Sequence, residues 1–216
     1  MFNPVLILIG LTVAISVYAW SKQELMDSWI MQPYLMARSS GQWYRLLTSG
    51  FLHADIAHLF FNMFAFYSFA PVVLGALYEG YGELPGLGLF LLLYLGGIIL
   101  SDLPTYFRHR DDRGYRSLGA SGGVASVLFA SILLFPVNNN GGGIIIFPIP
   151  FPIQPFLFGF LYLAYSYYMA RRRADNVNHD AHFYGALFGV VLMLILIPAA
   201  GPFFIQQISM FIKSKL

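Results

Sequence analysis

The sequence has no cysteine and little charge. Without thiols, disulfides and thiolate-bound metals are excluded. Charged residues make up 10% of the 216 residues, whereas a soluble domain carries roughly a quarter. The net charge is only +2, and the basic residues fall in short segments rather than on one broad face. We therefore expect no nucleic-acid partner.

Apolar residues are abundant instead. They account for 58% of the chain, and the mean hydropathy is +0.67. So much apolar surface exceeds any plausible water-soluble core, so lipid must surround most of it. The first apolar run has no basic residue before it and no small-residue cleavage pattern, and we expect an anchor rather than a signal peptide. We interpret residues 1–216 as one integral domain that crosses the lipid bilayer several times.

Six apolar segments approach the ~20 residues that cross a bilayer. They are about 4–20, 53–78, 86–103, 118–137, 156–170 and 181–200. Four prolines within 144–155 disfavour a helix, so 138–155 is expected to be a re-entrant or surface loop. The first loop, 21–51, mixes aromatic and basic residues and suits the membrane interface, as does a short helix at 203–216. The predicted fold class is an all-α membrane protein, a six-helix bundle with an interfacial first loop.

Unusual polar residues begin the second, fourth and sixth segments. In a six-span chain these three beginnings lie on one side of the membrane. His58 and Asn62 open the second segment, Ser121 the fourth and His182 the sixth. Polar groups in hydrocarbon are costly and point to function by default. Their shared level predicts one site.

Ser121 lies in Gly119-Ala120-Ser121-Gly122. Glycines around a serine often serve only close helix packing. They also permit a tight entry into a helix, which would put Ser121 in the first turn. First-turn N–H groups have no partner within the helix and can donate to a developing oxyanion. A serine nucleophile still requires a base.

His182 is the candidate base. Gly185 and Gly189 follow it on the same helical stripe and would let the sixth segment pack closely on the small residues after Ser121. A helix N-terminus disfavours the imidazolium, which leaves a neutral base. A histidine that only caps this packing motif is the alternative. His58 and Asn62, four residues apart, share one face and could complete an oxyanion hole, or Asn62 could simply bond a neighbouring helix.

Together these motifs resemble the rhomboid family of intramembrane serine proteases. The residues that carry the resemblance are Trp43-Tyr44-Arg45, His53, His58 with Asn62, Gly119-Ala120-Ser121-Gly122, and Ala181-His182 with Gly185 and Gly189. The resemblance spans nearly the whole chain. It implies a six-helix core and cleavage of transmembrane protein substrates near the membrane surface, without a cofactor or metal.

The resemblance also implies residue roles. Ser121 would be the nucleophile and His182 the general base, with His58, Asn62 and Gly119 as the stabilising group. Two positions depart from the family pattern. Tyr44 separates the usual Trp-Arg pair, and Ala125 stands where many relatives carry an aromatic residue that stacks on the histidine. Access to the site is expected to be controlled by the fifth segment and by residues 171–180.

Rival interpretations are a non-catalytic rhomboid-like scaffold and a protein whose histidines bind haem or a metal. A zinc protease is disfavoured because His-Glu-x-x-His is absent from the sequence. The compact chain suggests a bacterial inner or plasma membrane. Ten of the twelve Lys and Arg residues fall in loops on the active-site side, which the positive-inside rule assigns to the cytoplasm. The family usually opens to the outside, and we favour that orientation.

Overall fold

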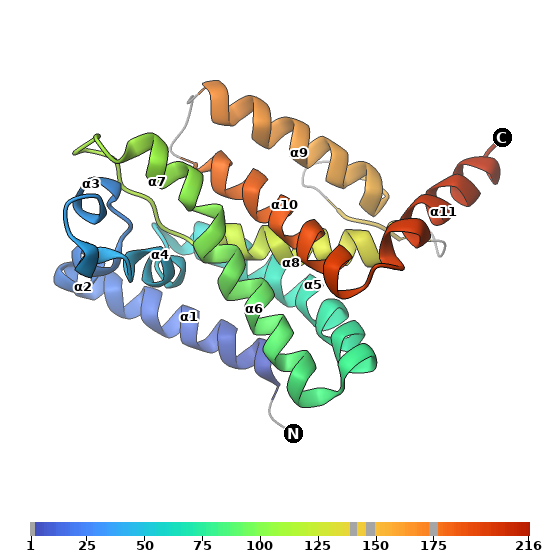
Figure 1. Ribbon diagram of the computed structural model, residues 1–216, viewed down its shortest axis with the longest axis horizontal. Coiled ribbons are helices and arrows are strands. Elements are labelled where there is room, and N and C mark those ends of the chain that lie inside the picture. Colours follow the sequence, from blue (N-terminus) through green and yellow to red (C-terminus); the bar gives the residue numbers. More distant parts are fainter. Residues whose placement is uncertain (1–2, 139–141, 146–149, 173–176) are drawn as a thin grey trace.

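The computed structural model describes residues 3–138, 142–145, 150–172 and 177–216. The described chain is helical, apart from two isolated bridges that pair Met31 with Ser117 and Ile144 with Ile153. The long helices lie side by side, and the short helices of the first loop cover one end of them (Figure 1). The fold class predicted from the sequence, an all-helical membrane protein, is confirmed.

The elements follow the apolar segments of the sequence. They are α1 (Pro4–Ser21), α2 (Gln23–Trp29), α3 (Pro33–Met36), the 3-10 helix η1 (Ser40–Gln42), α4 (Arg45–Thr48), the 3-10 helix η2 (Ser49–Phe51), α5 (Ile56–Tyr81), α6 (Glu83–Ser101), α7 (Leu103–His109), α8 (Ser121–Leu134), α9 (Pro155–Arg172), α10 (His179–Leu196) and α11 (Ala200–Lys213).

Within the part of the chain that the structure describes, four stretches are long and apolar enough to cross a membrane. They are α1, α5, the combined α6–α7 stretch Glu83–His109, and α10. The chain is thus a multi-pass membrane protein. The apolar helix α8 is shorter, at 14 residues, and α9 carries several tyrosines and two arginines. The number of six crossings stays a prediction.

Helix α8 lies at the centre of the bundle. Twelve of its 14 residues are buried, and α5, α6, α9 and α10 all pack around it. Small residues permit the close contact with α6, since a Cβ at Gly123 would lie 2.7 Å from the Tyr94 carbonyl oxygen. The Ser126 hydroxyl donates to the Leu93 carbonyl at 2.9 Å and so ties the two helices together. The centre of the fold is therefore the helix that begins with Ser121.

The first loop forms a compact cover. The guanidinium of buried Arg45 donates to the carbonyl oxygens of Asp27 and Ile30 at 2.8 and 2.7 Å. These bonds satisfy a buried charge and fix the path of the chain after α2. The Met31–Ser117 bridge then joins the loop to the segment that leads into Ser121. The first loop therefore supports the entry to α8.

Two predicted segments lie partly outside the described residues. In the loop 138–155, residues 139–141 and 146–149 are outside them, as are residues 173–176 of the segment 171–180. The C-terminal helix α11 begins at Ala200 and projects from the end of the bundle opposite α2 and α3 (Figure 1). Its interfacial position stays a prediction.

Candidate active site

Helix α8 begins at Ser121 itself. Its N-cap residue is Ala120, which offers no side-chain acceptor to the first turn. The first N–H groups of a helix have no acceptor within that helix, so those of α8 are available to an incoming oxygen. Ser121 is partly buried, while the residues that follow it in α8 are buried. A serine hydroxyl and uncapped N–H groups therefore occur at one helix end.

Helices α8 and α10 meet backbone to backbone. A Cβ at Gly185 would lie 2.9 Å from the Gly122 carbonyl carbon and 3.0 Å from its Cα. One turn along, a Cβ at Gly189 would lie 2.8 Å from the Cα of Ser126. Gly122 and Ser126 are four residues apart, as are Gly185 and Gly189, so the helices run parallel. The close helix contact predicted from the glycine stripe is confirmed.

This contact brings the beginnings of the two helices together. Ser121 directly precedes Gly122, and His182 precedes Gly185 by three residues, just under one turn. His182 is partly buried and lies in the first turn of α10. The contact between Gly185 and Gly122 thus brings the helix turns that carry Ser121 and His182 together.

His58 lies against Gly119. The Gly119 backbone has φ +124°, and a Cβ there would lie 2.9 Å from Nε2 of His58. Only glycine permits both this conformation and this approach. The other ring nitrogen of His58, Nδ1, faces the N–H of Ala54 at 3.5 Å, which favours a proton on Nε2. The Nε2 side of the imidazole thus faces the backbone just before Ser121.

Asn62 is buried on α5 but engages its own helix. Its side-chain amide donates to the His58 carbonyl at 2.9 Å. Asn62 therefore lies beside His58, as the four-residue spacing predicts, and its amide would have to turn to contact a substrate. Its role in an oxyanion hole stays a proposal.

His53 supports the entry to α8. It is fully buried in the loop ahead of α5, with Nδ1 3.0 Å from the Ser16 hydroxyl. Its Nε2 accepts from the N–H of Ala120 at 3.4 Å, directly before Ser121. Burial, helped by the neighbouring His58, lowers the pKa of His53 to about 3, so the ring is neutral at ordinary pH. The sequence assigned His53 to the loop entry without identifying these partners.

Asn178 fixes the beginning of α10. Its side-chain oxygen accepts from the Ala181 N–H at 3.1 Å and from the Thr105 hydroxyl at 3.0 Å. Its amide donates to Asp102 at 2.9 Å and to Ser117 at 3.1 Å. One side chain thus ties the helix of His182 to α6, α7 and the segment before Ser121. Sequence reasoning missed it, although an Asn just before a predicted helix is a usual cap signal.

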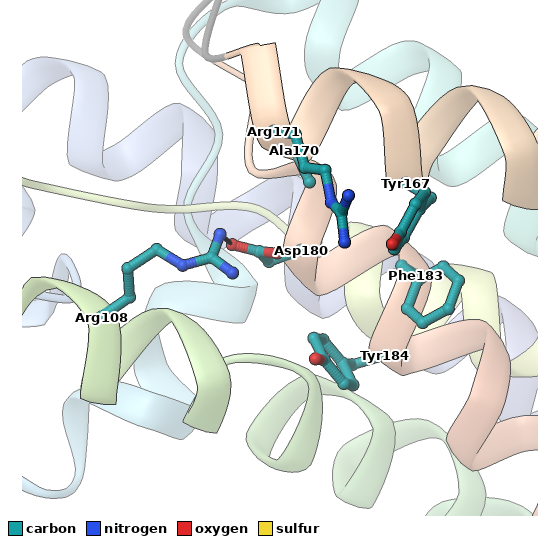
Figure 2. A pocket seen from close by; sticks show the side chains of 7 residues that line it. All are labelled: Arg108, Tyr167, Ala170, Arg171, Asp180, Phe183 and Tyr184. Atoms are coloured by element: carbon teal, nitrogen blue, oxygen red, sulfur yellow. Dashed lines mark hydrogen bonds and ion pairs between the residues drawn. The ribbon is translucent and has the colours of Figure 1, made fainter.

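An ion pair adds a second tie on the far side of α10. Figure 2 shows Arg108 of α7 reaching Asp180 of α10, beside a pocket of about 150 Å³ into which Arg171 of α9 also points. Asp180 is two residues before His182, about 200° around the helix, so this pocket lies behind the candidate site rather than within it. The ion pair between Arg108 and Asp180 joins α7 to α10 and helps to fix the position of α10.

A family model and three curated proteins match this chain. A family model described as "Rhomboid domain" matches residues 40–199. A Bacillus subtilis protein named "Putative rhomboid protease YdcA" is 33% identical over 107 residues, 50% of this chain and 48% of that protein. "Rhomboid protease GluP" of the same species is 35% identical over 102 residues, 47% of this chain and 17% of that protein.

A zebrafish (Danio rerio) relative is "Presenilin-associated rhomboid-like protein A, mitochondrial". It is 31% identical over 147 residues, which is 67% of this chain and 35% of that protein. The matched stretches thus span at most about half the length of these curated relatives. The family model covers well over half of the chain, including every candidate site residue. The chain therefore belongs to the rhomboid family.

Proposed function

We propose that this protein is an intramembrane serine endopeptidase. Ser121 is the nucleophile, His182 the general base, and His58, Asn62 and Gly119 form the stabilising group. The observation that carries the proposal is the backbone contact of Gly122 with Gly185, because it joins the first turns that hold Ser121 and His182. Family membership supports the reaction class.

The chemistry proceeds in two stages. His182 accepts the proton of the Ser121 hydroxyl as the oxygen attacks the scissile carbonyl carbon. The resulting oxyanion is stabilised by the first-turn N–H groups of α8 and by the Nε2 side of His58. Protonated His182 then gives its proton to the leaving amine, which departs and leaves an acyl ester on Ser121. A water, deprotonated by His182, hydrolyses that ester and restores the serine.

The substrates are proposed to be transmembrane proteins cut near the membrane surface, in a bacterial inner or plasma membrane. A scissile bond must be extended to meet Ser121, so the substrate helix has to unwind locally. The reaction uses side chains and water and needs no cofactor. We propose that the site opens away from the cytoplasm. A single cysteine introduced at Arg113 should then react with an impermeant reagent from outside, and reaction from the cytoplasmic side alone would contradict this orientation.

Cleavage in liposomes tests the proposal. The native protein should cut at least one generic single-span substrate, whereas Ser121→Ala and His182→Ala should reduce cleavage to background. Cleavage that persists in both variants would refute the assignment. Failure of the folded native protein on several substrates would favour a non-catalytic rhomboid-like scaffold. A visible absorption band or bound metal in the purified protein would instead favour the histidine-ligated alternative.

A further inference from the structure

An aromatic ring from a different helix stacks on His182. The rings of Tyr162 and His182 have centroids 6.0 Å apart and planes 28° from parallel. Tyr162 belongs to α9, which runs antiparallel to α10 (Figure 1). The candidate base is therefore covered from the side of α9.

Tyr162 is held in place by its neighbours. Its ring packs on Phe129 of α8 at 5.5 Å and on Phe158, one turn back along α9, at 5.7 Å. Helix α9 approaches α8 closely here, since a Cβ at Gly159 would meet Phe129 and Ile132 at 3.5 Å. The Tyr162 ring therefore packs against both α8 and α10 instead of facing lipid.

Ala125 on α8 cannot supply such a ring. It is buried and lies one turn after Ser121 on α8, at the position where the family pattern often has an aromatic residue. A methyl group offers no face to an imidazole. His182 also makes an edge contact with His179 of its own helix, with ring centroids 5.7 Å apart.

We propose that Tyr162 is the positioning residue for His182, so that α9 rather than α8 supplies the aromatic support of the base. This inference rests on the proposed role of His182. A histidine side chain rotates about two bonds, and its second torsion is broad and weakly restrained. A ring stacked on one face restricts that rotation and keeps a ring nitrogen directed toward Ser121. Catalysis is sensitive to such alignment, because a misplacement of about 1 Å can cost about 10²-fold in rate.

The support depends on the position of α9. Only two of its 18 residues, Gly159 and Ser166, are buried, so this helix is weakly embedded. Displacement of α9, the predicted gate, would withdraw Tyr162 from His182. Alignment of the base therefore depends on a docked α9, and an enzyme with α9 displaced would bind substrate but cleave slowly until the helix returned.

The test compares Tyr162→Phe, Tyr162→Leu and the control Phe160→Leu on the same helix in the whole protein. Phenylalanine keeps the stack and should leave kcat within about twofold. Leucine fills similar space without a ring face and should lower kcat at least about tenfold while KM changes less than about twofold. Phe160→Leu removes an exposed ring from the same helix, away from Tyr162 and His182, and should leave kcat nearly unchanged.

A spectroscopic measurement separates this inference from the proposed function. In protein with 15N-labelled histidine, the ring signals of His182, assigned by their loss in His182→Ala, should move in Tyr162→Leu and stay in Phe160→Leu. An unmoved His182 signal, or an equal fall of kcat in both leucine variants, would overturn the inference. If the Ser121→Ala variant still cleaved the substrate, the proposed function would be refuted. The ring signals of His182 would still test the contact with Tyr162.

Discussion

Two of the neighbours of α10, α8 and α9, hold it in different ways. On one side, α8 meets α10 through backbone atoms at Gly185 and Gly189, with no side chain between them. On the other side, α9 meets it through rings, including Tyr162 on His182 and Tyr165 on His179. Burial differs as sharply, with twelve of 14 residues buried in α8 and two of 18 in α9.

This difference separates a fixed contact from an adjustable one. Backbone atoms in direct contact cannot be rearranged by a rotamer change, so the α8–α10 contact sets the distance between the first turns of these helices. Ring contacts are made by side chains rather than backbone, and α9 has only two buried residues, Gly159 and Ser166, to hold it in the bundle. We infer that the movement needed for substrate entry falls on α9, while α8 and α10 stay together.

Gly185→Ala should give the largest effect, because it breaks the fixed contact. The new Cβ would meet the Gly122 backbone, which no side-chain movement can relieve, so the helices must separate. We expect cleavage to fall more than about 100-fold, together with a lower thermal midpoint. The control is Gly88→Ala on α6, where a Cβ meets nothing within 4 Å. Gly88→Ala should keep full activity, and its free energy of unfolding should rise by up to about 1 kcal/mol. Equal activity of the two variants would contradict a fixed α8–α10 contact.

His58→Ala and Asn62→Ala test the two side chains proposed to stabilise the oxyanion. His58 faces Gly119 with Nε2, and loss of one oxyanion donor typically costs about 10²–10³ in kcat. The Asn62 amide is already bonded to the His58 carbonyl, so its removal should cost less, about tenfold or below. Steady-state kinetics on one substrate measures both. A larger loss for Asn62→Ala would show that its amide turns toward the substrate during the reaction.

Asn178→Ala should reduce cleavage less than Gly185→Ala or His58→Ala does. It removes the cap of α10 and the bonds to Asp102 and Ser117, but leaves the glycine contacts intact. Loss of a cap costs about 0.5–2 kcal/mol, so the thermal midpoint should fall while kcat declines only a few-fold. The measurement is thermal unfolding in detergent beside the cleavage rate. A loss of activity as large as that of Gly185→Ala would mean that the cap, not the helix contact, places His182.

The close contact between α8 and α10 could be predicted from the sequence. Ser121, His182 and the glycines lie in short motifs whose helical spacing can be read directly, and Gly185 and Gly189 do contact Gly122 and Ser126. Glycine at two positions one turn apart has few physical explanations other than close approach. The sequence also put His58 at the same level as Ser121, but the approach of His58 to Gly119 was seen only in the structure.

The contact between α9 and α10 could not be predicted in the same way. Helix α9 contains many aromatic residues, so nothing in its sequence distinguishes Tyr162 from Tyr165 or Tyr167. Its partner depends on the antiparallel register between α9 and α10, which is set by packing over the whole helix. Likewise, Asn178 is recognisable as a cap, but its bonds to Asp102 and Thr105 join positions more than 70 residues apart.

The most direct test of the central claim is covalent labelling by a serine-reactive fluorophosphonate. The reagent forms a stable ester with an activated serine oxygen, and mass spectrometry locates the modified residue. The account predicts an adduct on Ser121 in the native protein, far slower labelling in His182→Ala, and none in Ser121→Ala. Equal labelling rates in the native protein and His182→Ala, or an adduct on another serine with Ser121 untouched, would contradict it.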